Sequence, residues 1–110
     1  MKSSKSTLNI NLENVRHNYE ELKKACPNAD VGASVKSDSY GLGVHMIAPI
    51  LKGSGCQYFF VATCDEGIAL RSVVGRDVNI YVFHGVFYNE IDAFVEYDLI
   101  PVLNHLAQVE

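Results

Sequence analysis

The sequence predicts an α/β fold in which parallel strands alternate with helices. Apolar segments of strand length recur about every 20 to 25 residues, with amphipathic helical segments between them. The segment 57–63 is almost continuously apolar, as expected for a strand buried on both faces of a parallel sheet. Polar loops that contain glycine follow the strands, at the positions where α/β proteins place their chemistry.

The first two expected elements are a strand over residues 7–11 and a helix that follows it. The strand alternates, with Leu8 and Ile10 on one face. Asn11 is suited to cap the helix, which Pro27 ends. The apolar positions of this helix recur at spacings of three and four: Leu12, Val15, Tyr19, Leu22 and Cys26.

The middle of the chain predicts two further strand–helix units. A strand over 31–35 precedes a helix over 43–51, which tolerates Pro49 if it kinks there. The strand over 57–63 leads into a capping box, in which Thr63 and Glu66 satisfy each other's backbone donors. Gly75 closes the helix that follows.

The last part of the chain predicts a strand over 78–83, a helix capped by Asn89 and a strand over 99–103. Asn104 could cap one more helix. In the helix after Asn89, the apolar positions fall together on one side: Ile91, Phe94 and Val95.

Helices between parallel strands are the crossovers of either a (β/α) barrel or a doubly wound sheet. A complete TIM barrel takes about 250 residues, and this chain has 110. The chain could therefore supply about the first half of a TIM-like barrel. We assign residues 1–6 to a flexible N-terminus and residues 7–110 to the N-terminal half of the barrel.

Composition excludes several classes of function. Nine Lys and Arg against 13 Asp and Glu give a net charge of −4, with no basic stripe for nucleic acid or anionic lipid. The longest apolar stretch is too short to cross a membrane, and the N-terminus does not resemble a signal peptide, so we expect a cytoplasmic protein. The three cysteines and four histidines lack zinc spacing, so we expect reduced thiols, mostly buried, and no metal.

Lys36 is the residue most suited to chemistry. It follows the strand over 31–35 and opens the polar, glycine-bounded loop 36–43. An uncharged lysine amine can form an imine with an aldehyde cofactor. Tyr40 could donate a hydrogen bond to a phosphate, and Gly43 lets backbone come close. On spacing alone, a solvated lysine without a catalytic role remains the alternative reading.

Residues 33–43 closely resemble the pyridoxal-phosphate attachment motif of the alanine racemase family, which is approximately apolar-Val-Lys-Ala-[Asp/Asn]-Ala-Tyr-Gly-[His/Leu]-Gly. Ser37 and Ser39 stand where that motif usually has alanines. The resemblance continues in order through nearly all of the chain after Ser6, in the segments 9–18, 61–71 and 82–87.

The resemblance implies a cofactor, a substrate and three site residues. Lys36 would hold pyridoxal 5′-phosphate as an internal imine and act as the base on the D-amino-acid face. Tyr40 would contact the cofactor phosphate, and Phe83 would lie at the strand end beneath the ring. The cofactor would act as electron sink for the carbanion at Cα. The implied isomerase activity interconverts L- and D-alanine, the latter for peptidoglycan.

The resemblance also implies parts that this chain does not contain. In the family, a complete barrel is followed by a β-rich domain, and the enzymes are head-to-tail homodimers. The opposite-face base is a tyrosine of that second domain, supplied by the partner subunit. We therefore expect a truncated or split racemase that is inactive alone and needs a second half or self-association, because a half-barrel leaves strand edges unpaired.

Other readings remain open beside this one. The chain could be a non-catalytic degenerate fragment, or a protein that binds pyridoxal phosphate without racemase activity. It could also belong to another pyridoxal-phosphate barrel, such as a single-domain cofactor-handling protein or an amino-acid decarboxylase. The residues Tyr40-Gly41-Leu42-Gly43 that follow Lys36 argue against these last two.

Overall fold

The computed structural model describes residues 9–109, in which parallel strands alternate with helices. The strands are β1 (Ala33–Ser34), β2 (Tyr58–Val61), β3 (Asn79–Val82) and β4 (Leu99–Pro101). The helices are α1 (Leu12–Ala25), α2 (Lys36–Tyr40), α3 (Val44–Gly53), α4 (Cys64–Val74) and α5 (Ile91–Glu96), with 3₁₀ turns at Tyr88–Glu90 and Leu106–Gln108. The sheet order is β1-β2-β3-β4, and every pairing is parallel. The predicted α/β fold is confirmed.

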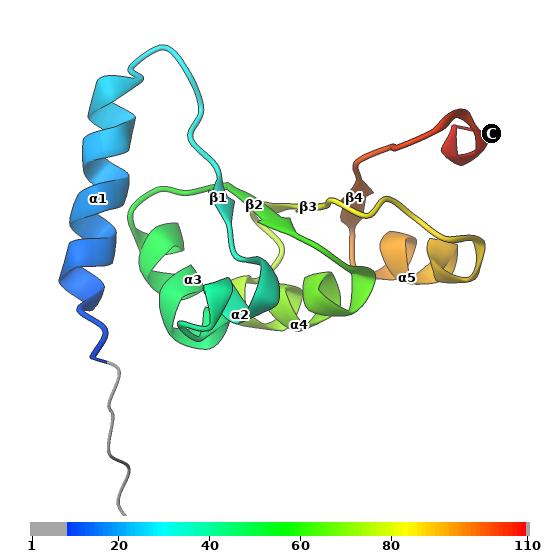
Figure 1. The fold of residues 1–110 in the computed structure, drawn as a ribbon, viewed down its shortest axis with the longest axis horizontal. Coiled ribbons are helices and arrows are strands. Elements are labelled where there is room, and N and C mark those ends of the chain that lie inside the picture. The colour runs from blue at the N-terminus through cyan, green and yellow to red at the C-terminus, as the bar shows by residue number, and fades with distance from the viewer. Residues whose placement is uncertain (1–8, 110) are drawn as a thin grey trace, which may run out of the picture.

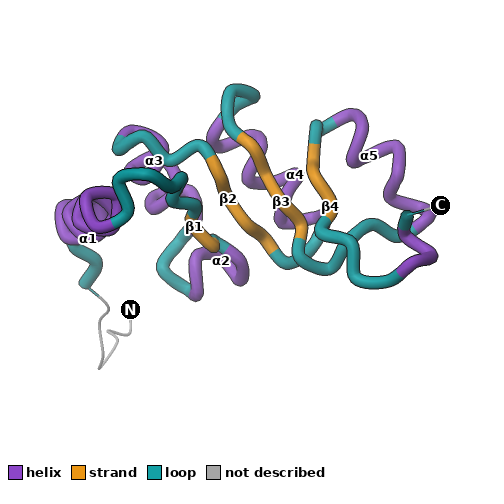
Figure 2. Tube along the Cα trace, turned by 90° about the horizontal axis from the view of Figure 1, so that it is seen from above, coloured by secondary structure: helices purple, strands orange, loops and turns teal. Residues whose placement is uncertain are grey.

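The helices cover one face of the sheet. Figures 1 and 2 show α3, α4 and α5 in a row along that face, with the opposite face uncovered by the described elements. Along β2, Phe59 and Val61 are buried, whereas Tyr58 and Phe60 are half-buried. The prediction that this strand is buried on both faces is wrong, because the described elements form only one helical layer.

The core lies between the sheet and these helices. Its largest fully buried side chains come from β2, β3 and α4, among them Phe59, Leu70 and Ile80. Cys56 and Cys64 belong to this core, as predicted, but Cys26 is exposed at the end of α1; all three are free thiols. Among the described residues, no helix has the length and apolar character needed to cross a bilayer.

Local capping signals correctly predict where α1 and α4 begin. The Asn11 side chain accepts a hydrogen bond from the Asn14 backbone N–H at 3.2 Å. Thr63 and Glu66 form the predicted capping box at the start of α4. Gly75 ends α4 with φ 82°, a conformation that favours glycine.

Three expectations about elements differ from the structure. Residues 7 and 8 of the strand predicted over 7–11, like the flexible N-terminus assigned to 1–6, lie outside the described residues. Residues 9–11 form no strand, because Asn11 instead caps α1. Leu22 is 56% exposed, because the C-terminal part of α1 extends past the sheet (Figure 1). Asn89 does not cap α5; it lies within a 3₁₀ turn, and the Phe87 backbone N–H donates to Glu90.

Arg71 ties together the loops at the amino end of the sheet. Its guanidinium donates to the backbone carbonyls of Tyr97 at 2.9 Å, Gly75 at 2.9 Å, Val78 at 2.8 Å and Asp98 at 2.6 Å. The residue is only 5% exposed. Burial lowers the pKa of this guanidinium below its ordinary value. One side chain of α4 therefore joins the segments that lead into β3 and β4.

The described part of the chain is a flat slab. It measures 49 × 46 × 24 Å, with a radius of gyration of 15.8 Å. A compact domain of this length has a radius of gyration of about 13 Å. Within residues 9–109, β1 and β4 are the edge strands, each paired on one side.

Candidate functional site

Two of the predicted site residues follow neighbouring strands at one edge of the sheet. Lys36 comes two residues after β1, and Phe83 comes directly after β3. Backbone hydrogen bonds to β2 hold both segments: the Val35 N–H donates to Phe60 at 2.8 Å, and the Phe83 N–H donates to Val61 at 2.8 Å. Because parallel strands end at the same edge, β2 places Lys36 and Phe83 on either side of its own carboxyl end.

The segment labelled α2, Lys36–Tyr40, is not a regular right-handed helix but a left-handed turn, which the sequence did not predict. Four consecutive residues, 37–40, have φ between 53° and 57°. This conformation costs L-residues roughly 1–2 kcal/mol each. Gly41 (φ 89°) and Gly43 (φ 94°) then lead into α3. Non-glycine residues in this conformation are strained, and the strain persists only where the surrounding structure holds the backbone in place. Here the strained residues lie in the loop that is predicted to carry the chemistry.

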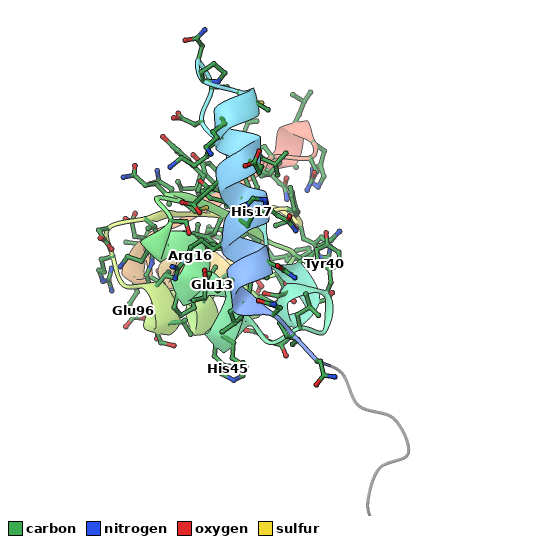
Figure 3. The ribbon with its side chains drawn as sticks, turned by 90° about the vertical axis from the view of Figure 1, so that its left-hand side faces the viewer. Glu13, Arg16, His17, Tyr40, His45 and Glu96 are labelled. Atoms are coloured by element: carbon green, nitrogen blue, oxygen red, sulfur yellow. The ribbon has the colours of Figure 1, made fainter. Side chains whose placement is uncertain are left out.

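The turn brings the third predicted residue back to the lysine. Lys36 Nζ lies 5.8 Å from the centroid of the Tyr40 ring and 5.8 Å from that of the Phe83 ring. Both distances are within the range of cation–π attraction. The Tyr40 hydroxyl lies 3.3 Å from Ser34 Oγ, and the Tyr40 side chain is 63% exposed. In Figure 3, Tyr40 projects from the side of the molecule opposite Glu96.

Two carboxylates hold the left-handed turn by accepting backbone hydrogen bonds. Asp38 Oδ1 accepts from the Val44 N–H at 2.7 Å, so Asp38 serves the local backbone, as its place in the loop predicts. Glu66 Oε2 accepts from the Ser37 N–H at 2.7 Å. The capping pattern identified Glu66 in the sequence, but no sequence signal indicated that it reaches the loop after Lys36.

A row of aromatic rings extends from the site across the uncovered face of the sheet. The Phe60 ring stacks on Phe83, with centroids 5.2 Å apart, and on Tyr81, with centroids 4.9 Å apart. Tyr58 and Phe60 were expected in the core together with Phe59, but only Phe59 is fully buried. The row places Phe83 against the Phe60 ring, which restricts the directions its side chain can take.

Among the described residues, no hydrogen bond or ion pair joins a histidine to Lys36, Tyr40 or Phe83. His17, His45 and His84 are exposed, and Figure 3 shows His45 at the lower edge of the molecule, away from Tyr40. Within residues 9–109, no cluster of three or more His, Cys, Asp or Glu side chains is arranged to hold a metal ion. The chemistry of the site is therefore that of one amine, two aromatic rings and nearby hydroxyls.

Replacing Ser39 by alanine should stabilise the chain. Ser39 is 4% exposed, and its hydroxyl has no hydrogen-bond partner among the described residues. Because a buried unsatisfied hydroxyl costs about 1 kcal/mol or more, Ser39→Ala should raise the free energy of unfolding by about 1 kcal/mol in urea titrations. The matched control is Ser37→Ala, in the same turn but exposed, which should change nothing. Destabilisation by Ser39→Ala would mean that the hydroxyl has a partner.

Comparisons with known proteins point to one family. The model of the family described as "Alanine racemase, N-terminal domain" matches residues 10–110. Alanine racemases of Rickettsia prowazekii and Rickettsia typhi are 49% and 47% identical to the chain over 104 residues, which cover 94% of this chain. The same alignments cover 26% of each relative, so the chain spans about a quarter of their length.

Solved structures agree with this result. The alanine racemase of Bartonella henselae, solved with covalently bound pyridoxal phosphate, superposes with a TM-score of 0.87 at 32% identity, over 91% of this chain and 28% of that one. The alanine racemase of E. faecalis gives a TM-score of 0.83 at 26% identity, over 91% and 27%. The match over residues 10–110 includes the Lys36 loop, the capping box and the end of β3. The chain therefore belongs to the alanine racemase family, and residues 10–110 match the N-terminal domain of that family.

Proposed function

We propose that this chain is the cofactor-holding part of an alanine racemase and that Lys36 forms the covalent bond to pyridoxal phosphate. The observation that carries the proposal is the placement of one amine between two aromatic rings, at 5.8 Å from each, at the carboxyl edge of a parallel sheet. That edge is where barrel enzymes place their active sites.

The residues at this edge suit the chemical parts of the cofactor. Lys36 offers the amine that its aldehyde requires: the uncharged amine adds to the aldehyde carbon, and a water molecule leaves as the C=N bond forms. Phe83 offers an apolar ring surface, held in place by Phe60. Tyr40 and Ser34 offer adjacent hydroxyl groups that can donate to a phosphate. The bound cofactor supplies the electron sink that stabilises a carbanion at the amino acid's Cα.

The proposed role of Lys36 in the reaction is to move a proton on one face of Cα. Racemisation also needs a proton donor on the opposite face. Among the described residues, the aromatic groups near Lys36 Nζ are the Tyr40 and Phe83 rings, each with its centroid at 5.8 Å. The family resemblance assigns the donor on the opposite face to a tyrosine of a second domain. We therefore propose that racemisation of alanine requires a second polypeptide surface, either the remaining part of a racemase or another copy.

Incubation with pyridoxal phosphate, borohydride reduction and peptide mass spectrometry test the proposed covalent bond. We expect the pyridoxyl group on Lys36 at substoichiometric cofactor, with little on Lys23 or Lys24, which lie on α1. Equal modification of all three lysines would contradict the proposal and favour a non-catalytic member of the family.

The slab should associate in solution. Large apolar side chains are exposed around α5 and the last turn: Phe87, Tyr88, Ile91, Val95, Leu103, Leu106 and Val109. The strand β4 next to them is an edge, and uncovered apolar faces and strand edges favour association. We expect sedimentation to show dimers or larger species. A monomer with a sharp two-state thermal transition would contradict this.

A further inference from the structure

We propose that Glu66 is a positioning residue for Lys36: its carboxylate fixes the peptide between Lys36 and Ser37 and so sets the direction in which the amine is presented. That the direction of the amine matters for cofactor binding rests on the proposed function. The contact between Glu66 and the Lys36 loop is observed in the structure and does not depend on that function.

The carboxylate of Glu66 joins the ends of two strands. Its Oε2 accepts from the Ser37 N–H at 2.7 Å, and its Oε1 accepts from the Ala62 N–H at 2.7 Å. Hydrogen bonds from backbone N–H groups to a carboxylate are short and stronger than neutral ones. Ser37 belongs to the loop after β1, and Ala62 directly follows β2. One half-buried side chain therefore sets the distance between the Lys36 loop and the strand that also holds Phe83.

The geometry of Glu66 goes beyond the needs of its helix cap. In a capping box, the glutamate accepts from the N-cap backbone N–H, here that of Thr63. That bond is the longest of the three, at 3.4 Å, whereas the bonds to Ala62 and Ser37 are both 2.7 Å. The carboxylate is thus directed toward the Lys36 loop more closely than toward its own cap.

The left-handed turn is where this link has its effect. Ser37 is the first of the four left-handed residues, and its N–H is part of the peptide that begins at the Lys36 carbonyl. Strained backbone persists only where its surroundings hold it. Relaxation to right-handed backbone at Ser37 would change the direction in which the chain leaves Lys36. The approach of the Tyr40 ring to Lys36 Nζ, at 5.8 Å, would then be lost.

Three variants separate positioning from simple stabilisation of α4. Glu66→Gln keeps the size of the side chain, but its amide nitrogen cannot accept a hydrogen bond. Glu66→Asp keeps the charge near the helix N-terminus but shortens the reach, and it serves if the first variant does not fold. The matched control is Thr63→Ala, which removes the hydroxyl that accepts from the Glu66 N–H at 3.2 Å and costs about 1 kcal/mol of capping. It leaves the bond to Ser37 in place.

The first readout is selectivity. Each variant is incubated with pyridoxal phosphate and reduced with borohydride, and the rate of pyridoxyl modification at Lys36 is divided by the rate at Lys24 in the same sample. We expect the ratio to fall about tenfold in Glu66→Gln and Glu66→Asp. A tenfold change in rate corresponds to the loss of one charge-assisted hydrogen bond. In Thr63→Ala it should stay within about twofold of the unsubstituted chain, because a uniform loss of stability does not favour one lysine over another.

The second readout is hydrogen–deuterium exchange of residues 36–43 by mass spectrometry, without cofactor. Exchange there should accelerate in both Glu66 variants and not in Thr63→Ala. An unchanged ratio in Glu66→Gln, or an equal fall in Thr63→Ala, would overturn the proposal. If the unsubstituted chain shows no selectivity for Lys36, the proposed function fails. The exchange data then decide the role of Glu66 alone: acceleration supports the link to the turn, and unchanged exchange refutes it.

Discussion

Replacing Lys36 by alanine should abolish the visible absorption band that pyridoxal phosphate forms with this chain. Lys36 Nζ lies 5.8 Å from the centroids of both the Tyr40 and Phe83 rings, whereas Lys23 and Lys24 lie on α1, which Figures 1 and 2 show on the side of β1 away from β3. Without the amine at position 36, the described residues offer the cofactor aldehyde no other amine at this edge of the sheet. The measurement is a titration with pyridoxal phosphate followed by absorption, before and after borohydride.

The matched control for this variant is Lys24→Ala. Lys24 is exposed on α1, where its Nζ lies 3.7 Å from Glu21 Oε1, a surface pair that contributes little to stability. We expect Lys24→Ala to keep both the band and its response to borohydride. A band of equal intensity in Lys36→Ala would show that the cofactor reacts with other amines, and the assignment of Lys36 would then be wrong.

Replacing Arg71 by methionine should lower the free energy of unfolding by about 3 to 5 kcal/mol, a large share of the stability of a small domain. Methionine keeps an unbranched apolar chain in place of the arginine stem, but it removes four hydrogen bonds to backbone carbonyls. The bond to Val78 is buried and the other three are part-buried, so the carbonyls would lose donors that water replaces only in part, at about 1 kcal/mol for each group left unsatisfied. The loss should appear as a lower urea midpoint, or as a chain already unfolded in buffer.

Arg76→Met is the control for Arg71. Arg76 is exposed and donates to one carbonyl, that of Glu96, at 2.9 Å. We expect its replacement to change the free energy of unfolding by about 0.5 kcal/mol or less. Equal effects of the two variants would mean that the four carbonyls find water or other donors when Arg71 is removed.

The sequence predicted those parts of the fold that depend on local signals. The alternation of strands and helices, the Asn11 cap and the Thr63–Glu66 capping box each need only neighbouring residues. The sequence named Glu66 as the partner of Thr63, but it predicted neither the contact of Glu66 with Ser37, 29 residues away, nor the bonds of Arg71, whose partner Tyr97 lies 26 residues away. No local rule specifies such distant backbone partners.

The roles of the three site residues stay predictions, and the shape of the loop that carries two of them was not predicted. The family resemblance named Lys36, Tyr40 and Phe83, and the structure brings the three together. The left-handed turn at 37–40 was missed because serine and tyrosine ordinarily avoid that conformation and aspartate adopts it only as a single residue, so these side chains give no signal for a run of four. The exposure of Leu22 was missed because periodicity defines an apolar face but not how far the neighbouring sheet extends.

The most direct test of the account is reconstitution of racemisation. This chain, with and without Lys36→Ala, would be co-expressed with the Rickettsia prowazekii alanine racemase from which the matching 26% has been removed. Formation of D-alanine from L-alanine would then be measured for each pair and for each polypeptide alone. The account predicts D-alanine only from the pair that retains Lys36. Activity in the Lys36→Ala pair would contradict the account. So would the absence of activity in a pair whose two polypeptides associate and whose Lys36 still forms the pyridoxyl product.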